Sequence, residues 1–155
     1  MPSYHAAGAC KVLRRECYED IRGFVVSAGW DTVDEIRAIS RGWRTGHFAD
    51  LRMKHHKLEG SGVGMIRTSV MHGEIYHRTG GNRLFFLLKV LRRIGTKPYG
   101  VSALALLWGY LTALWERKAP LVTEAEATCY QALLSERMQM MTKALFARGS
   151  ASSIP

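Results

Sequence analysis

Hydrophobic residues recur at helical spacing through the second half of the chain. The pattern predicts helices over residues 65–77, 83–94, 101–115 and 123–146. Asn82 stands before the second of these helices as an N-cap. Thr123-x-x-Glu126 forms a capping box at the start of the last one, in which the two side chains bind free backbone N–H groups. The second half is therefore predicted to be mainly helical.

The segment from Val101 to Trp115 is almost wholly apolar. It is shorter than the roughly 20 residues that a helix needs to cross a bilayer. Two interpretations stay open: a helix buried in the core, and a helix that lies in the membrane interface. The basic helix before it favours the second, because its cations would meet acidic lipid head groups.

The first half mixes short apolar stretches with helical ones. Ala9 to Leu13 predicts a strand that leads into a turn of helix over 15–21. Thr32-x-x-Glu35 matches a capping box and predicts a helix from 33 to 41. Residues 51–56 alternate as in a half-buried strand that ends in two histidines, and a glycine-rich loop follows. The expected fold class is therefore α/β, with a few short strands and helices followed by a mainly helical region.

The chain has 155 residues, of which 47% are hydrophobic, and its formal net charge is +9. This balance favours an anionic partner, namely nucleic acid, acidic lipid or a phosphorylated substrate, although a solvated basic surface is the simpler interpretation. The cations are spread along the chain and no nucleic-acid-binding motif is present, which argues against nucleic acid. The three cysteines match no zinc pattern and indicate free thiols in a reducing compartment.

Three segments follow one another in an order that resembles a known family. They read "GWDTVDEIRAISRGWRT", "FADLRMKHHKLEGSG" and "KPYGVSALALLWGYLTAL". Together with "GACKVLRRECYEDIRGF" upstream, they resemble the C-terminal, acceptor-side half of bacterial family 2 glycosyltransferases. The resemblance covers about Gly8 to Arg117. It implies a partial GT-A core in residues 1–64, a helical and possibly membrane-associating region over 65–148, and a flexible tail over 149–155.

The resemblance also implies a reaction and its residues. A sugar would pass from a nucleotide-diphosphate sugar to the hydroxyl of a glycan or lipid-linked acceptor. Asp31, eleven residues before Gly42, matches the family's general base, with Asp34 and Glu35 as alternatives. The further site residues that the resemblance implies, as acceptor or diphosphate contacts and as metal-side histidines, are Trp30, Trp43, Arg14, Arg15, Gly60, Ser61, His55 and His56.

Each of these residues also has a purely structural interpretation. Asp31 would then be an acid at a helix start, the tryptophans would fill core, and a histidine would end a strand. Under that interpretation the chain is a non-catalytic basic module that binds anionic lipid or nucleic acid.

The family's first half binds the nucleotide and supplies an Asp-x-Asp motif for Mg²⁺ or Mn²⁺, but this sequence contains no Asp-x-Asp. We therefore expect a truncated or split enzyme, inactive alone, which needs a partner chain that carries the first half and its metal. The expected location is cytoplasmic, with a peripheral position at the inner membrane as the further possibility.

Overall fold

A computed structural model describes residues 10–48, 50–51, 54, 56, 64–97 and 99–151, with side chains up to residue 143. The ordered elements are the helices α1 (Arg15–Asp20), α2 (Trp30–Ser40), α3 (Met65–Arg78), α4 (Arg83–Ile94), α5 (Val101–Trp115) and α6 (Glu124–Ala151). No residue of these described ranges lies in a β-strand. The predicted α/β class with a partial GT-A core is therefore wrong, and the described fold is helical.

The first predicted strand does not form, because a strand needs a partner to pair with. Arg14 has the extended backbone of a strand, with φ −66° and ψ 147°, but no neighbouring segment of the described chain forms a ladder with residues 11–14. Of the second predicted strand, residues 51, 54 and 56 have no regular structure. Its remaining residues, His55 among them, lie outside the described ones.

The helices of the second half begin where their caps predict. Asn82 Oδ1 accepts hydrogen bonds from the backbone N–H groups of Leu84 and Phe85 at 2.9 and 3.1 Å. The backbone N–H of Thr123 donates to Glu126 Oε2 at 2.9 Å, and that of Glu126 donates to Thr123 Oγ1 at 3.3 Å. Both predicted caps are confirmed. The helix α6 continues to residue 151, past its predicted end near residue 146.

The start of α2 differs from its prediction. The helix begins at Trp30, and Gly29 with φ 85° is its N-cap. Thr32 therefore lies within the first turn, and the predicted capping box between Thr32 and Glu35 does not form. A Cβ atom at Gly29 would lie 2.6 Å from Ile75 Cγ2. Only glycine allows the start of α2 to pack this closely against α3.

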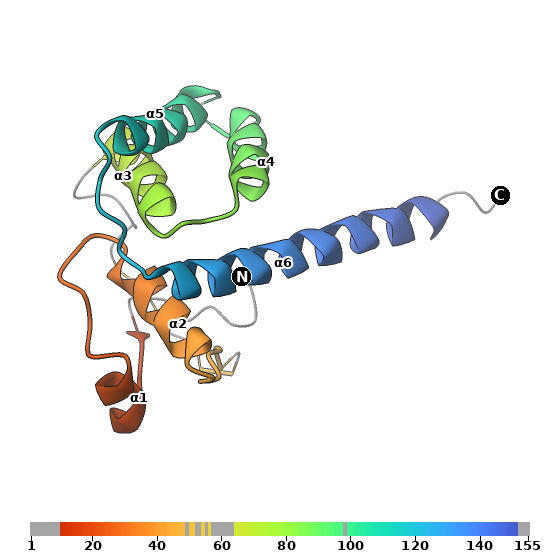
Figure 1. The fold of residues 1–155 in the computed structure, drawn as a ribbon. Helices are drawn as coiled ribbons and strands as arrows, with labels where there is room; N and C mark the ends of the chain where they lie inside the picture. The colour runs from red at the N-terminus through yellow and green to blue at the C-terminus, as the bar shows by residue number, and fades with distance from the viewer. Residues whose placement is uncertain are drawn as a thin grey trace.

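Two glycines bring α3 and α5 into contact along their length. A Cβ atom at Gly73 would lie 2.0 Å from the backbone oxygen of Leu106, and one at Gly109 would lie 1.9 Å from that of Val70. No side chain fits at either position. The two helices consequently lie side by side, and α4 packs against α5 (Figure 1).

The hydrophobic core is divided among the helices. Its largest cluster joins α3, α4, α5 and α6 and consists of Tyr76, Phe86, Val90, Ala103, Leu106 and Leu134. A second cluster joins α1 to α2 through Cys17, Ile21 and Ala38. A third holds α2 against the start of α6 through Val33, Ile36 and Val122. In Figure 1, α3, α4 and α5 form one end of the molecule and α1 the other, while α6 projects from the body.

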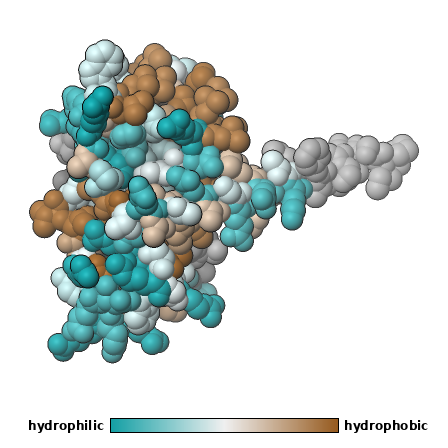
Figure 2. Space-filling view, in the orientation of Figure 1, coloured by the Kyte–Doolittle hydropathy of each residue, from teal (hydrophilic) through white to brown (hydrophobic). Residues whose placement is uncertain are grey.

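The helix α5 is partly buried and partly exposed. One face is buried and includes Leu106 and Ala113, whereas Leu104, Trp108 and Trp115 are exposed. The helix α4 buries Phe86 and Val90, and its leucines are exposed. Figure 2 shows hydrophobic side chains gathered over α4 and α5. Within the described chain, none of the helices combines the length and the apolarity that crossing a membrane requires.

Candidate carboxylate site

The side chain of Lys11 is buried against the first turns of α2. Its Nζ donates hydrogen bonds to the backbone oxygen of Asp31 at 2.6 Å and to Asp34 Oδ1 at 3.0 Å. Glu35 Oε1 lies 3.5 Å from the same Nζ, and the centre of the Trp30 ring lies 5.6 Å from it. The acidic cluster beside the tryptophan therefore surrounds one buried ammonium group, whose charge offsets that of the two carboxylates.

Asp34 is the most deeply buried of these acids, and only 2% of its side chain is exposed. Its Oδ1 accepts from Lys11 and from the backbone N–H of Glu35, the latter at 2.8 Å. Its Oδ2 is buried and has no hydrogen-bond partner among the described residues. An unpaired buried carboxylate oxygen is costly and is typical of a functional site.

Burial raises the pKa of the Asp34 carboxyl above its ordinary value. Lys11 acts in the opposite direction through its hydrogen bond and its charge, as does the backbone N–H of Glu35, while the charge of Glu35 adds to the rise. The net result is a carboxylate that binds a proton more tightly than an exposed one does. A general base near neutral pH needs this property.

Asp34 lines a groove with a volume of about 770 Å³ between the segment before α1, the helix α2 and the segment that follows α2. The residues of the groove that bear on its chemistry are Lys11, Cys17, Asp34, Glu35, Trp43 and Thr45. Thr45 Oγ1 is the second buried polar atom without a partner among the described side chains. Both atoms are themselves shielded from solvent, so they lie behind the lining of the groove rather than on its surface.

The structure separates the three predicted acids. Asp31 lies in the first turn of α2, where its Oδ1 accepts from the backbone N–H of Thr32 at 3.0 Å. It does not line the groove, whereas Asp34 and Glu35 do. Glu35, predicted as a cap partner, instead approaches Lys11. Among the acids, Asp34 alone combines burial, a raised pKa and an unpaired oxygen.

Of the predicted substrate-binding residues that the structure describes, two line the groove and two do not. Trp43 lines the groove, and its Nε1 donates to Asp20 Oδ2 at 2.8 Å, which fixes the orientation of the indole ring. Arg14 lines the groove as well. Trp30 packs against Lys11 and the ring of Phe24 instead. Arg15 is exposed and pairs with Glu19 of its own helix.

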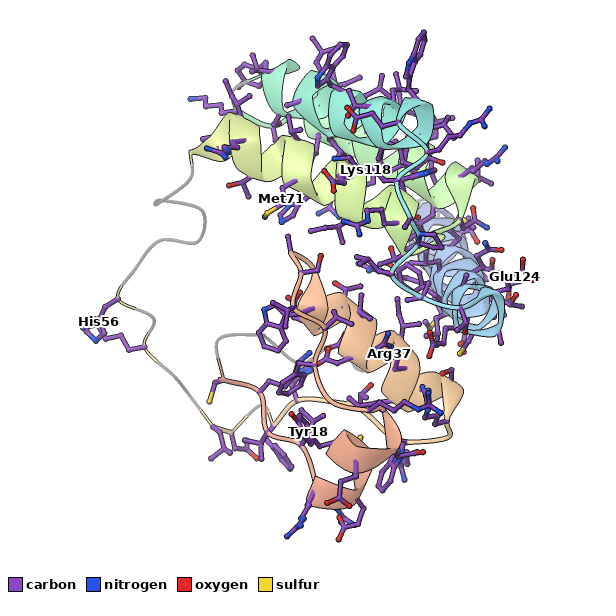
Figure 3. The ribbon with its side chains drawn as sticks, turned by 60° about the vertical axis from the view of Figure 1, so that its left-hand side comes forward. Tyr18, Arg37, His56, Met71, Lys118 and Glu124 are labelled. Carbon is purple, nitrogen blue, oxygen red and sulfur yellow. The ribbon has the colours of Figure 1, made fainter. Side chains whose placement is uncertain are left out.

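Of the two predicted metal-side histidines, the structure describes only His56. His56 is exposed, and Figure 3 shows it apart from α2, the helix on which Arg37 is labelled. His55, Gly60 and Ser61 lie outside the described residues. The described residues contain no group of three acids, histidines or cysteines that could hold a metal ion. Lys11 already occupies the space between Asp34 and Glu35, so these residues do not fit a cation, and we assign no step to a metal here.

Lys11 is the residue that the sequence interpretation missed. It stands in an apolar stretch, and its partner Asp34 is 23 residues away. The only signal was a single cation between apolar residues upstream of an acidic cluster.

The fold and the groove define a helical protein with a buried carboxylate site. No protein-family model, curated protein or solved structure matches the chain.

Proposed function

We propose that this chain supplies the acceptor side of a glycosyltransferase, which transfers a sugar from a nucleotide-diphosphate sugar to an acceptor hydroxyl. The observation that carries the proposal is the buried Asp34 carboxylate, with one unpaired oxygen, on the wall of a groove that could admit a sugar. The resemblance of the α2 segment to family 2 glycosyltransferases supports it. The general base moves from Asp31 to Asp34, because Asp31 does not reach the groove.

In the proposed reaction, the acceptor displaces the side chains that shield Asp34 Oδ2, and Oδ2 then takes the proton of the acceptor hydroxyl. The acceptor oxygen then forms a bond to the anomeric carbon of the donor sugar. The bond from that carbon to the diphosphate oxygen breaks, and the diphosphate leaves with the bonding electron pair. Lys11 binds the other oxygen of Asp34 at 3.0 Å, so it holds the carboxylate while leaving Oδ2 free to receive the proton.

The walls of the groove supply acceptor binding. The Trp43 ring, fixed by its hydrogen bond to Asp20, offers an apolar face against which a sugar ring can stack. Thr45 also lines the groove, although its Oγ1 is shielded from solvent. The nucleotide-sugar donor would be bound by a partner polypeptide that carries the nucleotide-binding half, since the sequence contains no Asp-x-Asp motif.

The test is a transfer assay. The chain is co-expressed with candidate nucleotide-binding polypeptides that carry an Asp-x-Asp motif, and release of nucleoside diphosphate from a panel of nucleotide sugars is measured. Asp34→Asn keeps an oxygen that accepts from Lys11 but removes the base, so turnover should fall at least about a hundredfold. Asp31→Asn is the matched control and should leave turnover within a few-fold. Circular dichroism checks that both variants are folded.

The pH profile separates a base from a structural residue. Because the pKa of Asp34 is raised, kcat/KM should increase with pH through a range above that of an ordinary carboxylate. Equal turnover in wild type and a folded Asp34→Asn variant would contradict the role of Asp34. Loss of turnover only in Asp31→Asn would return the role to Asp31.

The exposed face of α5 favours a second candidate function, binding to an anionic membrane surface. Leu104 and Trp108 are 69% and 64% exposed, and residues 75–115 contain no Asp or Glu. An apolar face within a segment without carboxylates suits acidic head groups. Sedimentation with phosphatidylglycerol vesicles tests this: Trp108→Glu should abolish binding, whereas Val26→Glu, at an exposed apolar position outside the α5 face, should not.

A further inference from the structure

A second pocket lies between α2, α3, α4 and α6, and its volume is about 300 Å³. The residues on which the inference depends are three cations and three aromatic residues: Lys89, Arg92, Arg137, Tyr76, Phe85 and Tyr130. We call this the cation pocket. Two of the cations belong to α4 and the third to α6, so the fold gathers them from distant parts of the sequence.

The charges of the cation pocket are not balanced. Glu35 is the only carboxylate that lines it within the described chain, and Glu35 also approaches Lys11 on its other side, at 3.5 Å. None of the three cations takes part in an ion pair with a described residue. Three positive groups that share one small pocket with a single carboxylate attract an anion.

Burial makes this imbalance costly for Lys89. Burial lowers the pKa of Lys89 to about 8, and the charges of Arg93 and Arg137 contribute to the fall. The charged form of Lys89 is thus less favoured in the free protein than the charged form of an exposed lysine. A bound anion would favour it again, because an opposite charge within a few ångströms stabilises the ammonium group.

Aromatic rings hold two of the cations in place. Lys89 Nζ lies 5.3 Å from the centre of the Tyr76 ring, and the guanidinium carbon of Arg137 lies 5.4 Å from that of Phe85. The Tyr76 hydroxyl donates to the backbone oxygen of Asn82 at 2.8 Å, which fixes its ring. Lys89 and Arg137 are therefore positioned before any ligand arrives, which reduces the entropy lost on binding, whereas Arg92 is exposed.

We propose that the cation pocket binds a phosphate or diphosphate group through Lys89, Arg92 and Arg137. A phosphate group carries up to two negative charges and several acceptor oxygens, which matches two guanidinium forks and one ammonium group better than a single carboxylate does. The group could belong to a soluble ligand or to a lipid, since Leu88 of the exposed leucines on α4 also lines the pocket. The proposal does not depend on the carboxylate site.

The first arm of the test uses inorganic pyrophosphate and isothermal titration calorimetry on the full chain. Wild type should bind it, and Lys89→Met should bind about tenfold more weakly or worse, because it loses a charge-assisted hydrogen bond. Lys97→Met removes a charge from an exposed lysine just beyond α4 and should change the affinity less than twofold. Arg137→Gln and its control Arg83→Gln repeat the comparison for arginine.

The second arm uses vesicles of phosphatidylcholine with and without phosphatidic acid. Binding of phosphatidic acid vesicles that requires Lys89, in the absence of pyrophosphate binding, would identify a lipid phosphate as the ligand. Binding of pyrophosphate would identify a soluble one. Either outcome supports the proposal, and NMR should then show the pKa of Lys89 rising from about 8 when the ligand is present.

Two outcomes would overturn the proposal. One is that folded wild type binds neither pyrophosphate at millimolar concentration nor phosphatidic acid vesicles. The other is that Lys97→Met weakens binding as much as Lys89→Met does, since the anion would then respond to overall charge rather than to the cation pocket. Thermal unfolding of each variant confirms that a lost signal does not reflect a lost fold.

Discussion

The groove beside α2 and the cation pocket are two solutions to the placement of charge inside one small protein. In the groove, Lys11 compensates Asp34 and Glu35 by direct contact, and one carboxylate oxygen is left over. In the cation pocket, Lys89 is half-buried near other cations without an ion pair from the described residues. The first arrangement offsets the charge of buried carboxylates with one cation and leaves one carboxylate oxygen without a partner among the described residues. The second is a cost to the fold that a ligand could remove.

The largest expected effect comes from breaking the compensated site. Lys11→Met should destabilise the protein by about 3 kcal/mol or more, because two carboxylates would remain buried with their common cation gone. The free energy of unfolding by urea measures this. Arg15→Met removes the cation of an exposed pair with Glu19 and should cost no more than about 0.5 kcal/mol. Equal losses in the two variants would show that the burial of Lys11 contributes nothing.

The region that carries the cation pocket depends on close backbone contact rather than on ion pairs. Gly109→Ala should destabilise the protein by about 2 kcal/mol, because its Cβ atom would overlap the backbone oxygen of Val70 and force α3 and α5 apart. Gly95→Ala is the control, since a Cβ atom there meets nothing within 4 Å. A small change in Gly109→Ala, similar to the control, would mean that the two helices separate without cost.

The same contrast shows what the sequence could predict. The helices of the second half followed from strong periodicity and from the caps at Asn82 and Thr123, which are local signals. The first strand was wrong because a short apolar run such as residues 9–13 has no period, and its pairing depends on a distant partner. Residues 51–56 do alternate, but residues 51, 54 and 56 have no regular structure. Of the carboxylate site, the sequence predicted Asp34, Glu35 and Trp43 but not Lys11, which meets Asp34 only through tertiary packing. The cation pocket was not predicted, because only the fold brings Lys89 and Arg137 to one pocket.

A matched substitution at the uncompensated site should have the opposite sign. Lys89→Met, in buffer free of phosphate, should stabilise the protein by about 1 kcal/mol, because it replaces a disfavoured buried charge with an apolar side chain of similar length. With pyrophosphate present, wild type should gain stability by ligand binding and the variant should not. Destabilisation by Lys89→Met without ligand would show that Lys89 has a compensating partner after all.

The pH dependence of that difference gives a further check. Lys89 has a folded pKa of about 8 against an ordinary 10.5, so the unfolded chain binds more protons between these values. The stability of wild type relative to Lys89→Met should therefore rise as the pH goes from 8 to 10.5, and the advantage of the variant should shrink. A difference that stays constant over this range would contradict the lowered pKa.

The smallest expected effect is the titration of Asp34 itself. The folded pKa of Asp34 is raised above its unfolded value of about 3.8, so the folded protein binds the extra proton. The contribution of Asp34 to stability is then fully present below the unfolded pKa and is lost as the pH rises through the folded one. Comparing wild type with Asp34→Asn isolates the contribution of Asp34 from those of Glu74 and Glu126. The pKa values of these two glutamates are lowered, so their contributions to stability increase as the pH rises.

The unfolding free energy of wild type should fall relative to the variant as the pH rises from 3 to 7. A relative increase would mean that Lys11 outweighs burial and that Asp34 is an ordinary ion-pair partner, without the proton affinity that a general base requires.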